Sequence, residues 1–209
     1  MKRILSSCLA LVVMAAAAFA QTPEEIVAKM DKVTESHQND GVYMIMEMKL
    51  PIIGSFPTKT WTLGRKVKTE TNRDEITLFT FTDLDANTMW MYDPSANEVE
   101  IRTIDGSAAS SQTADVSMFS DVTEGYDLSI KKEYADYWQL ECKKSKSNPD
   151  KDAPKYVYIE VYKNYFPKSL QATMSGVTIV LRDLDFNVTE DQVTFKVEDY
   201  PGVTITDKR

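Results

Sequence analysis

The chain has 209 residues, of which 43% are hydrophobic and 27% are charged, and its formal net charge is −8. This is the composition of a globular protein, and the length suits one domain. The acidic balance, without a run of basic residues, argues against binding to nucleic acid or to an anionic membrane surface.

Residues 1–20 have the pattern of a secretory signal peptide. Lys2 and Arg3 give a basic start, an apolar stretch follows, and Ala18-Phe19-Ala20 is a small-x-small cleavage site. The apolar stretch is shorter than a membrane span. We therefore expect cleavage after Ala20, and we expect residues 21–209 to form a single domain.

Cys8 offers an alternative start, because Leu5-Ser6-Ser7-Cys8 resembles the site at which bacterial lipoproteins are cleaved and acylated. The apolar stretch lies after Cys8 rather than before it, however, so this cleavage would leave the stretch on the mature protein. Cleavage after Ala20 is the better prediction. It leaves Cys142 as the only cysteine, and no intrachain disulfide can then form.

A capping box predicts that the mature chain opens with a helix. Thr22 is followed three residues later by Glu25, and Pro23 suits the first helical position. Apolar residues then recur with helical spacing between Ile26 and Val33. We expect one amphipathic helix that ends near Glu35 and needs an apolar surface to lie on.

After the helix the apolar period changes from 3.6 to 2, which predicts short strands joined by turns. The predicted strands span residues 44–50, 60–70, 75–82, 88–92, 98–103, 126–132, 134–143, 156–162, 168–173, 177–183 and 192–197, and residues 203–206 are a candidate for an additional edge. Such spacing indicates an antiparallel sheet, and ten or eleven strands must curl to protect their edges. We predict a mainly β fold with α: an incomplete antiparallel barrel whose concave face is covered by the first helix and by short lid helices within residues 105–125.

One predicted strand, residues 60–70, carries a charged residue on its apolar side. Strict alternation places Trp61, Leu63 and Val67 on that side together with Arg65, while Thr62 and its neighbours fall on the wet side. A buried guanidinium is costly unless its donors are used. We therefore expect Arg65 to point inward and to hold oxygen atoms.

Residues that could support catalysis or metal binding are scarce. The chain has one histidine and no His-x-x-His, Cys-x-x-Cys, Gly-x-Ser-x-Gly or glycine-rich phosphate motif. Its carboxylates fall in turns and at strand ends, where they usually serve solvation and capping. We expect no enzyme, no metal site and no cofactor.

Methionine is frequent on the predicted inward face, and its flexible thioether suits an adaptable lining. Core packing explains any single methionine better, but the whole set on a curled sheet makes a lipid cavity an equal alternative. The predicted cavity lining is Met44, Met46, Met48, Trp61, Leu63, Val67, Leu78, Met89, Met91, Ile101, Met118, Phe119, Leu140, Ile179 and Leu181.

The stretch Met89-Trp90-Met91-Tyr92-Asp93-Pro94 resembles the Leu-Trp-x-Tyr-x-Pro hairpin of the LolA-type periplasmic lipoprotein carriers and their lipoprotein-sorting relatives. Arg65 precedes this hairpin at the family's spacing. The C-terminal residues Leu184-Asp185-Phe186-Asn187-Val188, Phe195 and Pro201-Gly202-Val203 also follow the family's order. The resemblance spans essentially the whole mature chain. One departure is Lys66-Val67-Lys68, where the family commonly has proline and a large apolar residue.

The resemblance implies a carrier in the periplasm of a Gram-negative bacterium. Its cavity would take the acyl chains of acylated lipoproteins from an inner-membrane lipoprotein-releasing ABC transporter and pass them to an outer-membrane acceptor. It also implies that Arg65 acts as a latch on the lid. We expect a monomer without a nucleic-acid partner. Two alternatives stay open: a lipid- or lipoprotein-sensing module on the same fold, and an acylated outer-membrane acceptor modified at Cys8.

Overall fold

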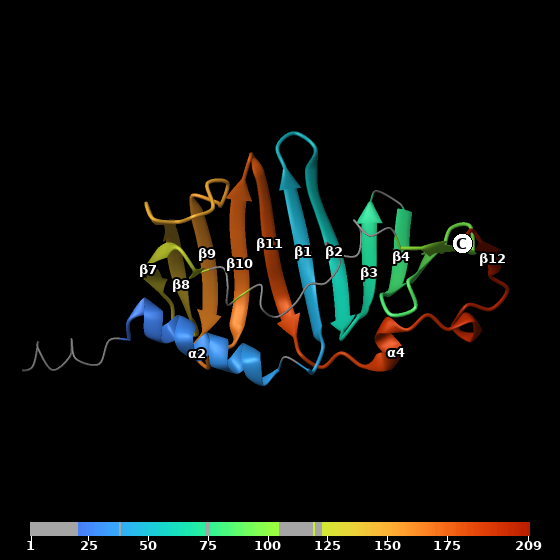
Figure 1. Cartoon of the computed structure of the whole chain (residues 1–209), viewed down its shortest axis with the longest axis horizontal. Coiled ribbons are helices and arrows are strands. Elements are labelled where there is room, and N and C mark those ends of the chain that lie inside the picture. Colours follow the sequence, from blue (N-terminus) through green and yellow to red (C-terminus); the bar gives the residue numbers. More distant parts are fainter. Residues whose placement is uncertain (1–20, 38, 74–75, 105–118, 120–122) are drawn as a thin grey trace, which may run out of the picture.

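A single twelve-stranded sheet organises the protein in the computed structural model, which describes residues 21–37, 39–73, 76–104, 119 and 123–209. The strand order is β12-β6-β5-β4-β3-β2-β1-β11-β10-β9-β8-β7, and β12 and β7 form the two edges, so the sheet is open (Figure 1). Neighbouring strands are antiparallel except β12 and β6, which are parallel. The predicted incomplete antiparallel architecture is confirmed.

The strands and helices have the following bounds. The strands are β1 (Val42–Leu50), β2 (Gly54–Leu63), β3 (Lys66–Arg73), β4 (Ile76–Asp83), β5 (Thr88–Asp93), β6 (Glu98–Thr103), β7 (Tyr126–Glu133), β8 (Tyr137–Lys144), β9 (Tyr156–Tyr162), β10 (Pro167–Met174), β11 (Val177–Asp185) and β12 (Thr204–Asp207). The helices are α2 (Pro23–Ser36), α4 (Glu190–Val193) and the 3-10 turn η3 (Val197–Asp199). The predicted lid segment, residues 105–125, lies outside the described residues except Phe119 and residues 123–125.

Helix α2 begins with the predicted capping box. The Thr22 hydroxyl accepts a hydrogen bond from the Glu25 backbone N–H at 3.2 Å, and the Glu25 carboxylate accepts one from the Thr22 N–H at 3.3 Å. Ile26 and Met30 of the helix are fully buried and belong to the core cluster. Figure 1 shows α2 lying across the lower ends of the strands around β8–β10. The helix therefore covers only one part of the sheet.

The two faces of the sheet can be told apart by what covers them. We call the face that packs against α2 the helix face. Its buried side chains join the helix in one core cluster: Val42, Met44, Phe119, Trp138, Leu140, Cys142, Val157, Ile159, Val161, Leu170, Leu181 and Phe186, with Ile26, Val27 and Met30 of α2. We call the other side the outer face.

The predicted single strand over residues 60–70 is wrong, because the chain reverses in its middle. Gly64 and Arg65 form a two-residue turn in which Gly64 has a φ of 55°, a conformation that glycine adopts at low cost. Leu63 then pairs with Lys66, and Thr62 pairs with Val67. A residue and its partner across a strand pair share a face, so the turn moves Val67 to the face opposite Leu63.

The predicted strand over residues 192–197 is also wrong. This segment forms α4, an extended stretch and η3, and Figure 1 shows it running from the lower ends of β3 and β4 towards β12. Its aromatic side chains pack on those of the outer face: Phe195 meets Phe81 edge-on at 5.7 Å, and Tyr200 lies 4.4 Å from Tyr92, between ring centroids. The predicted edge at residues 203–206 corresponds to β12.

Candidate functional site

The helix face is aliphatic where α2 covers it. One row of paired side chains runs from Met46 on β1 through Leu181, Leu170, Ile159 and Leu140 on the four strands that follow in the sheet. The last four of these are buried. We call the helix-face side chains of β8–β11 the aliphatic half. Its dense packing against α2 makes it the hydrophobic core of the protein.

The same row changes chemistry when it is followed the other way from β1. Met46 pairs with Thr58, Thr58 pairs with Thr71, and Thr71 pairs with Leu78. The two rows below it continue this pattern: Met44–Thr60–Thr69–Thr80–Met91 and Val42–Thr62–Val67–Thr82–Met89. We call the helix-face side chains of β2–β5 the threonine–methionine half.

The threonines of this half differ in burial and in hydrogen bonding. Thr60, Thr62 and Thr82 are buried, and the hydroxyls of Thr58 and Thr71 lie 3.4 Å apart. Thr62 is only 7% exposed, and its hydroxyl has no hydrogen-bond partner among the residues that the structure describes. An unsatisfied buried hydroxyl costs about 1–3 kcal/mol, so this group calls for an explanation.

Apart from the buried Met44, the methionines of β1 and β5 lie partly open to solvent. Met48 is 40% exposed, and Met46, Met89 and Met91 have intermediate burial. They lie on β1 and β5, at the two sides of the threonines. The helix face therefore extends, as a soft and incompletely buried surface, beyond the part that α2 covers.

Most of the predicted cavity lining lies on the helix face. This set comprises Met44, Met46, Met48, Val67, Leu78, Met89, Met91, Leu140, Ile179 and Leu181, by strand register, and Phe119, by its place in the core cluster. Leu140, Leu181, Met44 and Phe119 are closely packed core residues. Met118 lies outside the described residues.

Trp61, Leu63 and Ile101 were predicted to line the cavity, and this prediction is wrong. All three point to the outer face: Trp61 pairs with Lys68, Leu63 with Lys66, and Ile101 with Trp90. The outer face of β4–β6 is also apolar, because the C-terminal segment packs on it. Phe195 of this segment stacks on Trp90 with 6.1 Å between the ring centroids. Alternation alone cannot distinguish two apolar faces.

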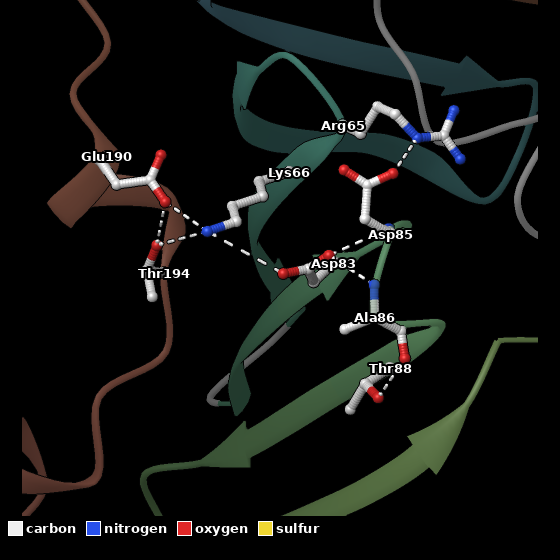
Figure 2. Close-up of polar contacts among 8 residues, drawn as sticks. All are labelled: Arg65, Lys66, Asp83, Asp85, Ala86, Thr88, Glu190 and Thr194. Carbon is white, nitrogen blue, oxygen red and sulfur yellow. Dashed lines mark hydrogen bonds and ion pairs between the residues drawn. The ribbon is translucent and has the colours of Figure 1, made fainter.

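Arg65 does not point inward, so the predicted latch is wrong. Its side chain is 62% exposed in the turn between β2 and β3, and its Nε donates to Asp85 Oδ1 at 2.6 Å (Figure 2). Exposed ion pairs of this kind contribute about 0–1 kcal/mol to stability. The physical reason for the error is the turn, which takes residue 65 out of the strand.

Lys66 makes the long-range polar contact at this place. Its ammonium group donates to Glu190 on α4 and lies 3.5 Å from the Thr194 hydroxyl and 3.9 Å from the Asp83 carboxylate (Figure 2). The hydrogen bond from Lys66 lowers the pKa of Glu190 and raises that of Lys66. Lys66 therefore fastens the C-terminal segment to the outer face.

Lys68 lies deeper on the same face, among aromatic rings. Its ammonium group is 5.0 Å from the ring of Trp61, 5.5 Å from Phe79 and 5.3 Å from Phe81. Burial lowers the pKa of Lys68. These contacts are part of the packing of the outer face. In the stretch Lys66-Val67-Lys68 the two lysines lie on that face, and Val67 lies on the helix face.

A depression of about 390 Å³ opens at one end of the aliphatic half. Val157 and Ala172 form its floor on the helix face, and Pro149 and Pro154 form its rim. Tyr126 also lines it and donates a hydrogen bond from its hydroxyl to the Pro154 carbonyl at 2.9 Å. Side chains of the helix face and of the loop at residues 148–154 thus meet at this depression.

The described part of the chain carries neither a metal-binding cluster nor a membrane-spanning helix. Across the described ranges, no group of three or more His, Cys, Asp and Glu side chains is placed to hold a metal ion. The described helices include none with the length and hydropathy required to cross a membrane.

Comparisons with known proteins find similarity in structure but not in sequence. No family model and no curated protein matches the chain. A conserved protein of Thermus thermophilus, described as uncharacterized, has a similar structure: it is 13% identical, the match covers 88% of this chain and 98% of that chain, and the TM-score is 0.43.

Two further similar structures carry names. The LolA superfamily protein NE2245 from Nitrosomonas europaea is 14% identical, with 86% of this chain and 100% of that chain covered and a TM-score of 0.33. The Mycobacterium tuberculosis lipoprotein LppX is 9% identical, with 75% and 92% covered and a TM-score of 0.44. The structural neighbours thus include the superfamily that the sequence resembles. The likeness is one of fold, and the function is argued from this chain's own residues.

Proposed function

We propose that this protein is a non-enzymatic binder of acyl chains, and that its cargo is the lipid-modified end of lipoproteins. The observation that carries this proposal is the threonine–methionine half, a strip of the helix face that lies beyond α2. Met48 is 40% exposed on the neighbouring strand β1, and Met46, Met89 and Met91 are half-buried. A finished core would not leave methionines on both sides of the threonines partly exposed to solvent.

The energetics suit reversible binding of hydrocarbon. Each methylene moved from water to an apolar surface contributes about 0.8 kcal/mol, so even one acyl chain along the helix face would bind with useful affinity. The methionines could adapt their side chains to chains of different length.

We further propose that the protein works in the periplasm as a carrier between a lipoprotein-releasing ABC transporter of the inner membrane and an acceptor in the outer membrane. The leader pattern of residues 1–20 and the resemblance to LolA-type carriers support this role. Intact-mass analysis of the protein from a Gram-negative host tests the location. A mature N-terminus at Gln21 is expected, whereas acylation at Cys8 would favour the acceptor alternative.

Two assays test the binding proposal. The protein, purified from the periplasm of its expression host, should carry acyl lipid that mass spectrometry detects after solvent extraction. Incubated with lipoprotein-loaded membrane vesicles, it should release a soluble complex with lipoprotein. An absence of both the bound lipid and the soluble complex would contradict the proposal.

A matched pair of variants locates the site. Met91→Lys places a charge on the half-buried helix face and should lower lipid affinity at least about tenfold, because a charge there loses its hydration. Ile205→Lys makes the same change on β12, where the side chain is already 45% exposed, and should bind like the unmodified protein. Equal losses in both variants would place the lipid elsewhere.

A further inference from the structure

Threonine hydroxyls cover one region of the helix face, which we call the threonine band. It consists of Thr58, Thr60, Thr62, Thr69, Thr71, Thr80 and Thr82 on β2, β3 and β4. Threonine favours strands on any sheet face, so the half-buried members Thr58, Thr69, Thr71 and Thr80 need no further cause. A site that only binds hydrocarbon would nevertheless be better served by valine, which has the same shape and no hydroxyl to desolvate.

Thr62 is the member that strand preference does not explain. It is more than nine-tenths buried on the helix face, and its hydroxyl has no hydrogen-bond partner within the described ranges of the chain. The pair Thr58 and Thr71, by contrast, lie within reach of each other at 3.4 Å. Buried hydroxyls are nearly always paired, and a bound group that supplies the missing partner would account for this one.

The charges around the band limit the kind of partner. Between Met44 and Met91 the paired helix-face positions are Thr60, Thr69 and Thr80, none of which is charged. The neighbouring row reaches a charge only at Arg102 on β6, which is already paired with Glu100. A phosphate or carboxylate would call for lysine or arginine, whereas neutral hydroxyl donors suit neutral carbonyl acceptors.

We propose that the threonine band binds the ester or amide carbonyls that join acyl chains to the rest of the cargo. The hydrocarbon would then lie along the methionines and towards the open end of the aliphatic half, and the band would fix the position of the linkage. This inference rests on the proposed function and names the chemical group that the same site recognises. Diacyl phospholipids and acylated lipoproteins share this linkage.

The test compares lipids that differ only in their carbonyls. The probes are a diacyl glycerophosphocholine and its dialkyl ether analogue of equal chain length, and a diacylglyceryl lipopeptide with its dialkyl counterpart. Affinities are measured by displacement of a fluorescent fatty acid. We expect the ester form to bind about three- to tenfold more tightly than the ether form, the range of one or two net hydrogen bonds.

Two variants assign the preference to residues. Thr62→Val with Thr60→Val keeps the branched shape, and it should abolish the ester preference without lowering the affinity for the ether lipids. The matched control, Thr173→Val with Thr178→Val, removes a hydroxyl pair that is 2.8 Å apart on the outer face, and it should leave the preference intact.

The outcomes are distinct. Equal binding of ester and ether lipids by the unmodified protein would overturn the inference while leaving acyl binding standing, and this result requires no variant. An ester preference that survives in Thr60→Val/Thr62→Val would overturn the assignment to the band. Failure to bind any of the four lipids would reject the proposed function itself. Where the preference holds, the tighter of the two ester probes identifies the source of the cargo.

Discussion

The two halves of the helix face share one sheet and one alternation but differ in chemistry. From Met46 the row is aliphatic towards Leu140 and hydroxyl-bearing towards Thr71. Helix α2 covers the aliphatic half, where Leu140 and Ile159 are fully buried. The comparison teaches that α2 supplies the core this fold needs for stability, whereas the methionines Met89 and Met91 of the threonine–methionine half stay only half-buried.

The largest expected difference between the halves is in thiol reactivity. Cys142 lies fully buried in the aliphatic half, and burial raises its pKa to about 12. A higher pKa lowers the thiolate fraction at pH 8, and the thiolate is the reactive species. Cys142 should therefore react with a soluble disulfide reagent about a thousandfold more slowly than a cysteine at Met91 in a Cys142→Ala background. Equal reaction rates for Cys142 in the unmodified protein and for the cysteine of the Met91→Cys/Cys142→Ala variant, both folded, would show that the two halves are equally open.

Stability should separate the halves next. Leu140→Ala removes a fully buried side chain from the aliphatic half and should lower the free energy of unfolding by about 2–5 kcal/mol. Met91→Ala, on the half-buried side of β5, should cost less than about 1.5 kcal/mol while lowering lipid affinity. Urea denaturation and lipid displacement measure the two effects. A larger stability loss for Met91→Ala would contradict the division into core and site.

The polar contacts at the β2–β3 turn should have smaller effects that differ from each other. Lys66→Met should loosen the C-terminal segment, visible as faster hydrogen exchange in residues 189–200, because Lys66 connects the sheet to Glu190 on α4 (Figure 2). Arg65→Ala should leave that exchange unchanged and should cost about 0–1 kcal/mol. If Arg65→Ala instead impaired lipid release, the discarded latch would have to be reconsidered.

The contact between Lys66 and Glu190 should also depend on pH. The pKa of Glu190 is lowered in the folded protein by its hydrogen bond with Lys66, so the stabilisation is complete above the ordinary pKa of 4.5 and is lost as the pH falls through the lowered folded value. Protection of the C-terminal segment against hydrogen exchange, taken relative to the intrinsic rate at each pH, should fall in that acid range, and Lys66→Met should remove the dependence. An unchanged acid response in Lys66→Met would assign it to other carboxylates.

The start of α2 and most of the strands could be predicted from the sequence, because residues a few positions apart determine them. The capping box from Thr22 to Glu25 sets the start of α2, and period-2 alternation gives the antiparallel strands. The methionines on β1 and β5 also lie on the predicted face. These features depend on neighbours a few residues away in the chain.

The errors share a different cause, which is contact between distant segments. Trp61 and Ile101 look like cavity residues because their outer face is covered by side chains that come from elsewhere in the chain, among them Phe195. Alternation with Trp61 and Leu63 places Thr62 on the predicted wet side, and threonine itself gives no sign of the error because it forms strands equally well on a wet or a dry face. A reversal at Gly64 and Arg65 is signalled only by one glycine in an otherwise continuous strand pattern.

The most direct test of the central claim is to find where an acyl chain lies. A fatty acid with a photoreactive group in its chain would be bound to the protein and cross-linked, and the labelled peptides would be mapped by mass spectrometry. We expect labels on helix-face residues of β1–β5, chiefly the methionines Met46, Met89 and Met91. Labels confined to outer-face residues such as Trp61 and Ile101 would contradict the claim that the open part of the helix face is the binding site.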